Sequence, residues 1–274
     1  MKTLSTHKTL SIATWNVNSI RQRIEHLLRW LAETQPDVVC LQEIKTLAET
    51  FPTAEIEALG YHVAVLGQKT FNGVALLSKY PLEDIRRGLP GDPDDEQSRY
   101  IEAVISVGGG VVRVASIYLP NGNPTTGVPV PGDKYDYKLR WMERLRVHAQ
   151  ALLTLEEPLV LAGDYNVIPA GRDTYDPALW EKDALFLPQT RAAFQRLLSL
   201  GLTEAVRSCT DTEKLYTFWD YQAGAWPRNN GIRIDHLLLS PQAADRLEST
   251  AIDKHVRDWE KPSDHVPVRG LFRL

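Results

Sequence analysis

The chain has 274 residues, of which 43% are hydrophobic and 24% are charged, and its formal net charge at pH 7 is −4. This composition is ordinary for a soluble globular protein and carries no overall basic signal for nucleic acid, although an acidic metal site would offset local basic patches in the sum. Two cysteines, Cys40 and Cys209, are too few for a disulfide framework. No segment has signal-peptide character, and no apolar run approaches the ~20 residues that span a bilayer. We therefore expect a reducing, cytoplasmic setting and no membrane partner.

The first predicted elements form a strand–helix–strand unit. Residues 11–15 form an apolar strand that ends at Asn16, and residues 38–42 form another that ends at Glu43. Between them, apolar residues recur at the spacing of one helix face, namely Ile20, Ile24, Leu27, Leu28 and Leu31. Ser19, with Gln22 three residues later, has the spacing of a capping box at the start of this helix.

Strands and irregular segments alternate through the middle of the chain. Strand patterns bounded by glycine and asparagine predict hairpins. The predicted elements are a short helix over 51–59, strands over 61–66 and 73–78, a surface loop over 88–98, and a hairpin of 99–107 with 111–118 across Gly108, Gly109 and Gly110. Cys40 lies inside an apolar strand and is expected to be a small core residue.

A long irregular loop over 121–133, with three prolines and three glycines, precedes a long helix. A loop of this length in a compact domain is usually functional or disordered. The helix has one apolar face, made by Leu139, Met142, Leu145, Ala149, Leu152 and Leu153. Basic residues lie on or beside that face, and we interpret most of them as a solvated surface: Lys138, Arg140, Arg144 and Arg146.

In the last third, the apolar run 159–162 enters Gly163 and is followed by Asp164 and Asn166. A helix over 189–200, an aromatic run over 216–221 and further apolar strands complete the pattern. Six strand-like segments thus carry an acid, amide, phenol or imidazole at one end, which is how sheet proteins assemble an active site from distant parts of the chain. Because no linker or change in composition interrupts the chain, we expect one α/β domain, 1–274, with mixed sheets.

Seven short motifs follow one another in a recognisable order. They are Ala13-Thr14-Trp15-Asn16, Leu41-Gln42-Glu43, Tyr118-Leu119-Pro120-Asn121, Gly163-Asp164-Tyr165-Asn166, Tyr216-Thr217-Phe218-Trp219-Asp220-Tyr221, Arg233-Ile234-Asp235 and Ser263-Asp264-His265. Each one alone arises readily by chance, but the ordered series spans nearly the whole chain. It resembles the exonuclease III family, the bacterial and animal abasic-site endonucleases of the endonuclease/exonuclease/phosphatase superfamily.

The resemblance implies a DNase I-like four-layer α/β sandwich, in which helices flank two packed mixed β-sheets and the site lies at one rim. It also implies a monomer that hydrolyses phosphodiesters of double-stranded DNA with Mg²⁺ or Mn²⁺. Its substrates would be abasic sites, blocked 3′ ends such as 3′-phosphates, and duplex 3′ ends removed stepwise. Which of these activities dominates is left open by the sequence.

Glu43 is the first candidate metal ligand, because a hard carboxylate suits Mg²⁺. The resemblance implies that Asn16 and Asp264 complete or support the metal shell. Asp164 and Asn166 either bind a second metal ion or act on the attacking water, and the sequence does not separate one metal from two. The alternative for Asn16 is a turn amide, and for Asp264 a capping carboxylate.

Three further side chains are expected to act on the phosphate. His265 would contact it, and Asp235 would orient the imidazole and favour its charged form. Tyr118 would also reach the phosphate, while Asp164 deprotonates the water. His236 matches no motif of the family and is interpreted as structural.

The resemblance also implies contacts with DNA. Lys45, Asn121 and Arg228 are expected to bind the backbone, and Phe218 is expected to pack against a flipped-out sugar. Trp219 suits either that role or plain core packing. Ile232 stands where the animal enzymes typically have tryptophan and is more like the bacterial branch.

Two alternatives to a DNA-repair nuclease remain at this stage. The first is a superfamily phosphatase that acts on a small phosphoester through the same metal site. The second is an inactive DNA-binding module, which would be expected to lack one of Glu43, Asp164, Asp235 or His265, whereas all four are present.

Overall fold

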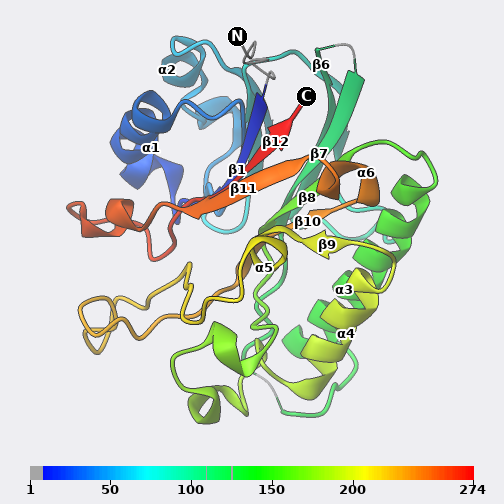
Figure 1. Ribbon diagram of the computed structural model, residues 1–274. Helices are drawn as coiled ribbons and strands as arrows, with labels where there is room; N and C mark the ends of the chain where they lie inside the picture. Colours follow the sequence, from blue (N-terminus) through cyan, green and yellow to red (C-terminus); the bar gives the residue numbers. More distant parts are fainter. Residues whose placement is uncertain (1–8, 109, 125) are drawn as a thin grey trace, which may run out of the picture.

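The computed structural model describes residues 9–108, 110–124 and 126–274, and its strands form two mixed six-stranded sheets (Figure 1). The first sheet has the order β11-β12-β1-β2-β4-β3. Its strands are β1 (Thr9–Asn16), β2 (Val38–Gln42), β3 (His62–Leu66), β4 (Val74–Ser78), β11 (Leu247–Ile252) and β12 (Val268–Arg273). Only β1 and β2 run parallel, and the other neighbouring pairs of this sheet are antiparallel.

The second sheet has the order β5-β6-β7-β8-β10-β9. Its strands are β5 (Leu82–Arg87), β6 (Tyr100–Val107), β7 (Gly110–Tyr118), β8 (Leu159–Asp164), β9 (Thr203–Glu204) and β10 (Asp235–Leu239). Here β7 and β8 form the parallel pair. The predicted hairpin of β6 and β7 is confirmed, with Gly109 of its turn outside the described residues, as is Thr125 of the 121–133 loop.

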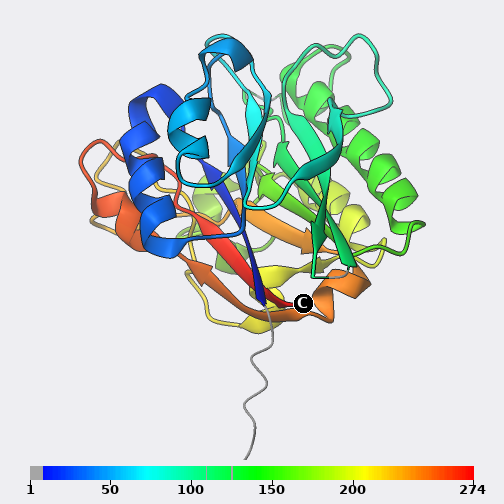
Figure 2. The same ribbon diagram turned by 90° about the horizontal axis from the view of Figure 1, so that it is seen from above.

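Helices cover the outer face of each sheet, which produces the layers seen in Figure 2. α1 (Ile20–Thr34) packs Trp30 against Trp15 on the first sheet. α3 (Lys134–Leu153) and α4 (Pro188–Leu198) cover the second sheet. The shorter helices are α2 (Thr53–Glu57), α5 (Ala205–Cys209) and α6 (Pro241–Ala244), with 3₁₀ turns at Ala48–Thr50, Gly171–Asp173, Pro177–Trp180 and Lys254–Asp258. The expected four-layer α/β sandwich is confirmed.

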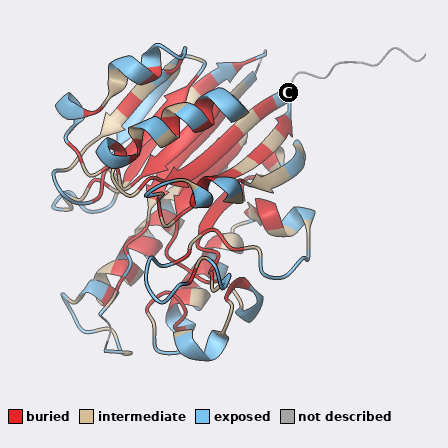
Figure 3. Ribbon diagram, turned by 90° about the vertical axis from the view of Figure 1, so that its left-hand side faces the viewer, coloured by how far each residue is buried: buried red, intermediate tan, exposed pale blue. Residues whose placement is uncertain are grey.

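The inner faces of the two sheets meet in a fully buried apolar core. Ile12 and Val38 of the first sheet belong to the same cluster as Val114 and Val160 of the second. The central strands of both sheets are correspondingly buried along most of their length, as the red ribbons in Figure 3 show. Cys40 is fully buried in this core, as predicted, and burial raises the pKa of its thiol above the ordinary range. None of the helices in the described ranges is long and apolar enough to cross a membrane.

One rim of the sandwich collects the ends of six strands. The parallel pairs β1–β2 and β7–β8 both present their carboxyl ends there. A hydrogen bond between Asn16 at the end of β1 and Asp164 at the end of β8 shows that these ends meet. The antiparallel strands β10 and β12 present their amino ends at the same place. This topology gathers side chains that are up to 249 positions apart, from Asn16 to His265.

The structure contains two strands that the sequence did not predict, and it lacks the predicted capping box. Strands β5 and β11 were not predicted, because both lie at sheet edges and most of their residues are at least partly exposed and polar. Ser19 has a φ of 86° and makes no side-chain cap hydrogen bond, so the capping box is wrong. Its backbone N–H instead donates to the carbonyl oxygen of Glu43, which ties the start of α1 to the rim.

The basic side chains of α3 differ from the predicted solvated face. Arg140 is exposed, with 62% of its side-chain surface accessible, but Arg144 keeps only 13%. Arg144 binds the Asp95 carboxylate at 2.6 Å and thereby fastens the 88–98 loop to the helix. Lys138 is fully buried. For these two residues the prediction is wrong, because their hydrogen-bond partners lie in loops far from the helix in sequence.

Candidate active site

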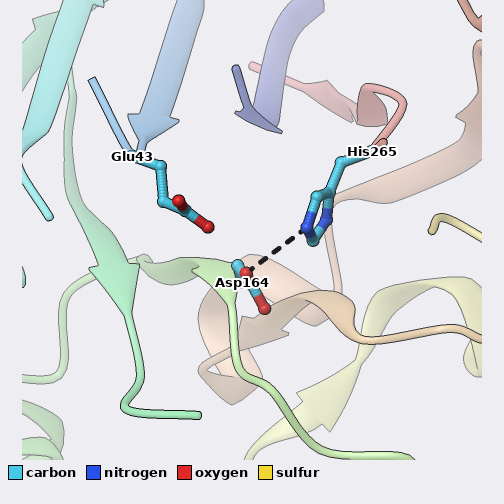
Figure 4. Close-up of side chains that lie close together, drawn as sticks. All are labelled: Glu43, Asp164 and His265. Carbon is cyan, nitrogen blue, oxygen red and sulfur yellow. Dashed lines mark ion pairs between the residues drawn. The ribbon is translucent and has the colours of Figure 1, made fainter. Parts of the chain in front are cut away.

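Glu43 and Asp164 approach each other at the rim, one from each sheet (Figure 4). Glu43 directly follows β2, in a left-handed turn with a φ of 49°, and Asp164 is the last residue of β8. The amide of Asn16 lies between them, and its Nδ2 donates to Glu43 Oε1 and to Asp164 Oδ2, both at 2.9 Å. One amide therefore holds together two carboxylates that would otherwise repel each other.

Asp164 lies in a network that orients its second oxygen. Its Oδ1 accepts the backbone N–H of Asn166 at 2.9 Å, and Asn166 has a φ of 48°. The Asn166 side chain donates to the carbonyl of Leu119 at 2.9 Å and accepts from Asn121 Nδ2 at 3.1 Å. Burial raises the pKa of Asp164 to about 7, against the opposing charge of His265. A carboxylate tuned close to neutral pH suits a general base.

His265 is held between two carboxylates. Its Nδ1 lies 2.9 Å from Asp235 Oδ2, and its Nε2 lies 3.7 Å from Asp164 Oδ2, the ion pair dashed in Figure 4. Thr217 Oγ1 donates to Asp235 at 2.6 Å and fixes that carboxylate. Although burial opposes the charged form, Asp235 and Asp164 raise the pKa of His265 to about 10. The imidazole is therefore a cation at neutral pH, with a proton on each ring nitrogen.

Tyr118 ends β7 and pairs in register with Asp164 on β8. Burial raises the pKa of its hydroxyl well above the ordinary value, and the charges of Glu43 and Asp164 raise it further. The hydroxyl therefore stays protonated and acts as a hydrogen-bond donor. The guanidinium of Arg99 lies 4.8 Å from the Tyr118 ring centroid and donates to the Tyr118 carbonyl, which fixes the phenol in place.

These side chains surround one pocket of about 290 Å³. Its polar side holds the acids, amides, phenol and imidazole: Glu43, Tyr118, Asn121, Asn166, Asp264 and His265, with Asp164 among them. The pocket is also lined by five apolar residues, here called the apolar wall, and by three further polar ones: Trp180, Leu185, Phe218, Ile232 and Ile234, with Asn123, Asp183 and Asp220. The Phe218 ring stands edge-on to the His265 imidazole, with centroids 5.0 Å apart. An anionic group and an apolar body would thus find matching walls in the same cavity.

The remaining predicted residues lie around this pocket. Lys45 Nζ contacts Glu43 Oε2 at 2.8 Å from outside the pocket, and Asp264 lines the rim and accepts from Asn18 at 3.1 Å. Arg228 is exposed in a neighbouring pocket of about 460 Å³ that shares Phe218 and Ile232 with the first. The structure therefore brings together every predicted catalytic and metal-site residue, and it places Lys45 and Arg228 at the periphery.

The donor set fits a hard divalent cation. Ligand atoms of Glu43, Asp164 and His265 lie within 4.8 Å of one another. Of these three residues, the two carboxylates are the candidate ligands for Mg²⁺, because this ion prefers oxygen donors. Despite burial, the ammonium of Lys45 and the amide of Asn16 hold the pKa of Glu43 below its ordinary value. The Oδ1 of Asn16 accepts the Asn18 N–H at 3.0 Å, so in this arrangement Asn16 supports the ligands.

Comparison with known proteins adds an independent observation. The model of the endonuclease/exonuclease/phosphatase family matches residues 13–265, which include every candidate catalytic residue. The chain belongs to this family. It is 34% identical over 271 residues to exodeoxyribonuclease III of Haemophilus influenzae, and the match covers 96% of this chain and 100% of that protein. The chain is therefore an exonuclease III-like hydrolase.

Two solved structures resemble this exonuclease III-like chain throughout. One is an AP endonuclease from Archaeoglobus fulgidus, with a TM-score of 0.89, 38% identity, and coverage of 97% of this chain and 100% of that one. The other is a 3′ phosphatase from Neisseria bound to a product DNA hairpin, with a TM-score of 0.89, 37% identity and the same coverage. The resemblance inferred from the seven motifs is confirmed.

Several residues of this exonuclease III-like site were not recognised in the sequence. Asn18 links Lys45, Asp264 and the backbone turn after β1, and its position two residues after Asn16 was the available signal. Thr217 lies inside the aromatic run and fixes Asp235. Trp219 is fully buried in the core cluster of the first sheet, so core packing is the role that its contacts support. His236 is buried against Arg233 and the Val167 carbonyl, in agreement with a structural role.

Proposed function

We propose that this exonuclease III-like hydrolase is a DNA-repair nuclease that requires Mg²⁺ or Mn²⁺. Its substrates are abasic sites within duplex DNA and the 3′ ends of duplexes, including 3′-phosphates. The observation that carries the proposal is the pocket, in which a cationic imidazole, a neutral phenol and a carboxylate pair face an apolar wall. Relatives described as an exodeoxyribonuclease, an AP endonuclease and a DNA-bound 3′ phosphatase support the substrate class.

The polar wall suits hydrolysis of a phosphate ester. Asp164 accepts the proton of the attacking water, because its pKa lies near 7, and Asn166 positions the water or a phosphate oxygen. His265 and Tyr118 donate hydrogen bonds to the phosphate oxygens on which negative charge develops. Glu43 would hold the divalent cation, which when bound would neutralise phosphate charge and stabilise the leaving oxygen, and Asp164 would stay free to act as the base.

The apolar wall suits the sugar. Phe218, Ile232 and Ile234 offer carbon surface with few hydrogen-bonding groups, which is what an abasic deoxyribose without a base to read requires. A terminal nucleotide with a 3′-phosphate presents the same sugar and phosphate to the same two walls. Since each motif residue comes from one chain, the site is complete in a monomer, and we propose that state together with duplex DNA as the partner.

The experiment that tests this function is a gel assay on 5′-labelled duplexes with Mg²⁺ and with EDTA. One duplex carries an internal abasic analogue, one a nick with a 3′-phosphate, and one a recessed undamaged 3′ end. Metal-dependent conversion of at least one duplex is the expected result, and the relative rates rank the activities. If all three duplexes stay intact while a small phosphoester is hydrolysed, the phosphatase alternative replaces the nuclease.

A variant pair separates catalysis from binding. Asp164→Asn removes the base but keeps the size of the side chain, so turnover is expected to fall by about 10²-fold or more while binding to abasic DNA in EDTA persists. Asp94→Asn changes an exposed aspartate of the 88–98 loop and serves as the control. Equal loss of binding and turnover in Asp164→Asn would indicate a structural role instead.

A further inference from the structure

Lys138 is a buried lysine that the proposed chemistry does not use, and burial lowers the pKa of its amine to about 7. It lies in α3, the helix that connects β7 to β8, and no part of its surface is exposed. Its Nζ donates to the backbone carbonyl oxygen of Asn166 at 2.6 Å and to that of Asn121 at 3.0 Å. A buried ammonium is unfavourable unless it is hydrogen-bonded, so a chain that retains one needs close partners for it.

The two carbonyls belong to the loops that carry the amides of the polar wall. Asn166 follows β8 and Asn121 follows β7, and their side chains are joined by the 3.1 Å hydrogen bond from Asn121 Nδ2 to Asn166 Oδ1. Lys138 therefore connects the two loops a second time, through their main-chain carbonyl groups, in addition to the hydrogen bond between the two side chains. With both links in place, neither loop can shift without breaking a contact to the other.

Gly122 shows that the backbone is fitted around this lysine. It has a φ of 89°, and a Cβ placed on it would lie 2.7 Å from Lys138 Cδ and 3.2 Å from Ala184 Cβ. The loop thus passes directly over the aliphatic part of the lysine, between Asn121 and the segment that forms the apolar wall. The next residue, Asn123, donates to Asp183 Oδ1 at 3.1 Å on that segment.

We propose that Lys138 is a positioning residue of the reaction, which fixes Asn121 and Asn166 at the separation that the phosphate or the attacking water requires. The proposal rests on the proposed function, because it assigns these two amides to substrate contacts. A lysine suits this role because its terminal nitrogen donates to two carbonyl oxygens at once. The role differs from that of a ligand, as Lys138 does not line the pocket.

Lys138→Met tests the proposal, because methionine keeps much of the length of the side chain but has no donor. Turnover at saturating substrate is expected to fall about 10- to 100-fold, since small displacements of positioning groups have effects of that size. KM is expected to change less than the turnover number. The thermal midpoint is expected to fall by only a few degrees, because the carbonyl oxygens of Asn121 and Asn166 lose one buried donor, and turnover is compared at a temperature at which both proteins are folded.

The matched control is Arg140→Met, two residues further along the same helix, where 62% of the side chain is exposed. It is expected to leave turnover unchanged. The decisive readout is a double-mutant cycle with Asn166→Ala. If Lys138 acts through Asn166, then Lys138→Met has little further effect on turnover once the amide is gone.

Each outcome decides the question. The proposal would be overturned if Lys138→Met kept full activity, or if its loss of turnover only matched the fraction of unfolded protein. It would also be overturned if Lys138→Met lowered turnover as much in the Asn166→Ala background as in the unchanged protein. If Lys138→Met does not fold, the cycle is run with Lys138→Gln, whose amide can donate to one of the carbonyls. Inactivity of the unchanged protein on every DNA substrate would count against the proposed function instead.

Discussion

At the residue scale, the site depends on two side chains in contact, Asp164 and His265, whose pKa values are both raised. Burial raises the pKa of Asp164 to about 7, and Asp235 together with Asp164 raises that of His265 to about 10. For His265 the folded value lies above the ordinary 6.5, so its pairing with Asp235 stabilises the fold fully just below pH 6.5. That contribution is lost as the pH rises through about 10.

The pH profile of turnover should reflect these two groups. Activity is expected to rise as Asp164 loses its proton, at or below pH 7, and to fall as His265 loses its proton near pH 10. Asp235→Asn removes the largest influence that favours the imidazolium, so the alkaline fall should move toward neutral pH and the maximal rate should drop about tenfold or more. The measurement is kcat against pH for both proteins with saturating Mg²⁺. An unchanged alkaline limb in Asp235→Asn would assign that limb to another group.

At the element scale, the two parallel strands that carry Tyr118 and Asp164 pack unusually close. A Cβ placed on Gly163 would overlap the carbonyl oxygen of Ile117 on the neighbouring strand. Gly163 has no positive φ, so the requirement for glycine here is one of space and not of conformation. The close approach brings the ends of β7 and β8 together, and with them the phenol and the carboxylate.

Gly163→Ala should therefore damage both stability and function. The methyl group can be accommodated only if the strands separate, which is expected to lower the free energy of unfolding by about 3 kcal/mol or more. Gly110→Ala at the other end of β7 is the control, because the nearest atom to its Cβ would be the Val107 carbonyl oxygen at 3.9 Å. Denaturant unfolding of the two variants checks this. If Gly163→Ala had the same free energy of unfolding as Gly110→Ala, the two strands would be able to separate without loss of stability.

At the scale of the whole molecule, the charges of the site lower the stability of the folded state. Glu43 and Asp164 are like charges brought together from separate sheets, and their mutual repulsion acts on the contact between the layers. A cation bound there removes that repulsion and binds only the folded state. Binding and stability are then linked by mass action.

Mg²⁺ should consequently raise the thermal midpoint. A concentration one hundred times the dissociation constant is expected to add about 2.7 kcal/mol to the free energy of unfolding. Glu43→Gln should abolish most of this gain, whereas Glu49→Gln, an exposed residue of the Ala48–Thr50 turn, should keep it. Calorimetry with and without Mg²⁺ makes the comparison. A similar gain in Glu43→Gln would move the metal site elsewhere.

Binding to DNA should depend on local charge, because the net charge of −4 gives no general attraction. Arg228 is exposed beside the apolar wall. Arg228→Gln is therefore expected to reduce the slope of log affinity for DNA against log salt concentration by about one. Arg273 lies at the opposite end of β12 from the site, and Arg273→Gln should leave the slope unchanged. The slope is measured from the affinity for an abasic duplex in EDTA at several salt concentrations. Equal slopes for both variants would contradict the predicted contact.

The sequence by itself indicated which strands are central and which side chains gather at the candidate site. Buried strands such as β2 and β8 read as short apolar runs, and the residues that end them, Glu43 and Asp164, interrupt that pattern visibly. The order of the seven motifs specified the family, and hence the sandwich. The edge strands β5 and β11 escaped prediction, since partly exposed strands need no apolar pattern.

Only the tertiary structure decided the environment of the basic and capping residues. Lys138 and Arg144 have the same local pattern as the exposed Arg140, and their burial depends on loops that fold back from 17 and 49 positions away. Ser19 faces the wrong way for a cap because its backbone is tied to Glu43 on the next strand. The pKa values of Asp164 and His265 likewise arise from burial and from neighbours distant in the chain. Local sequence sets propensities and patterns, whereas desolvation and long-range contacts exist only once the sheets have packed.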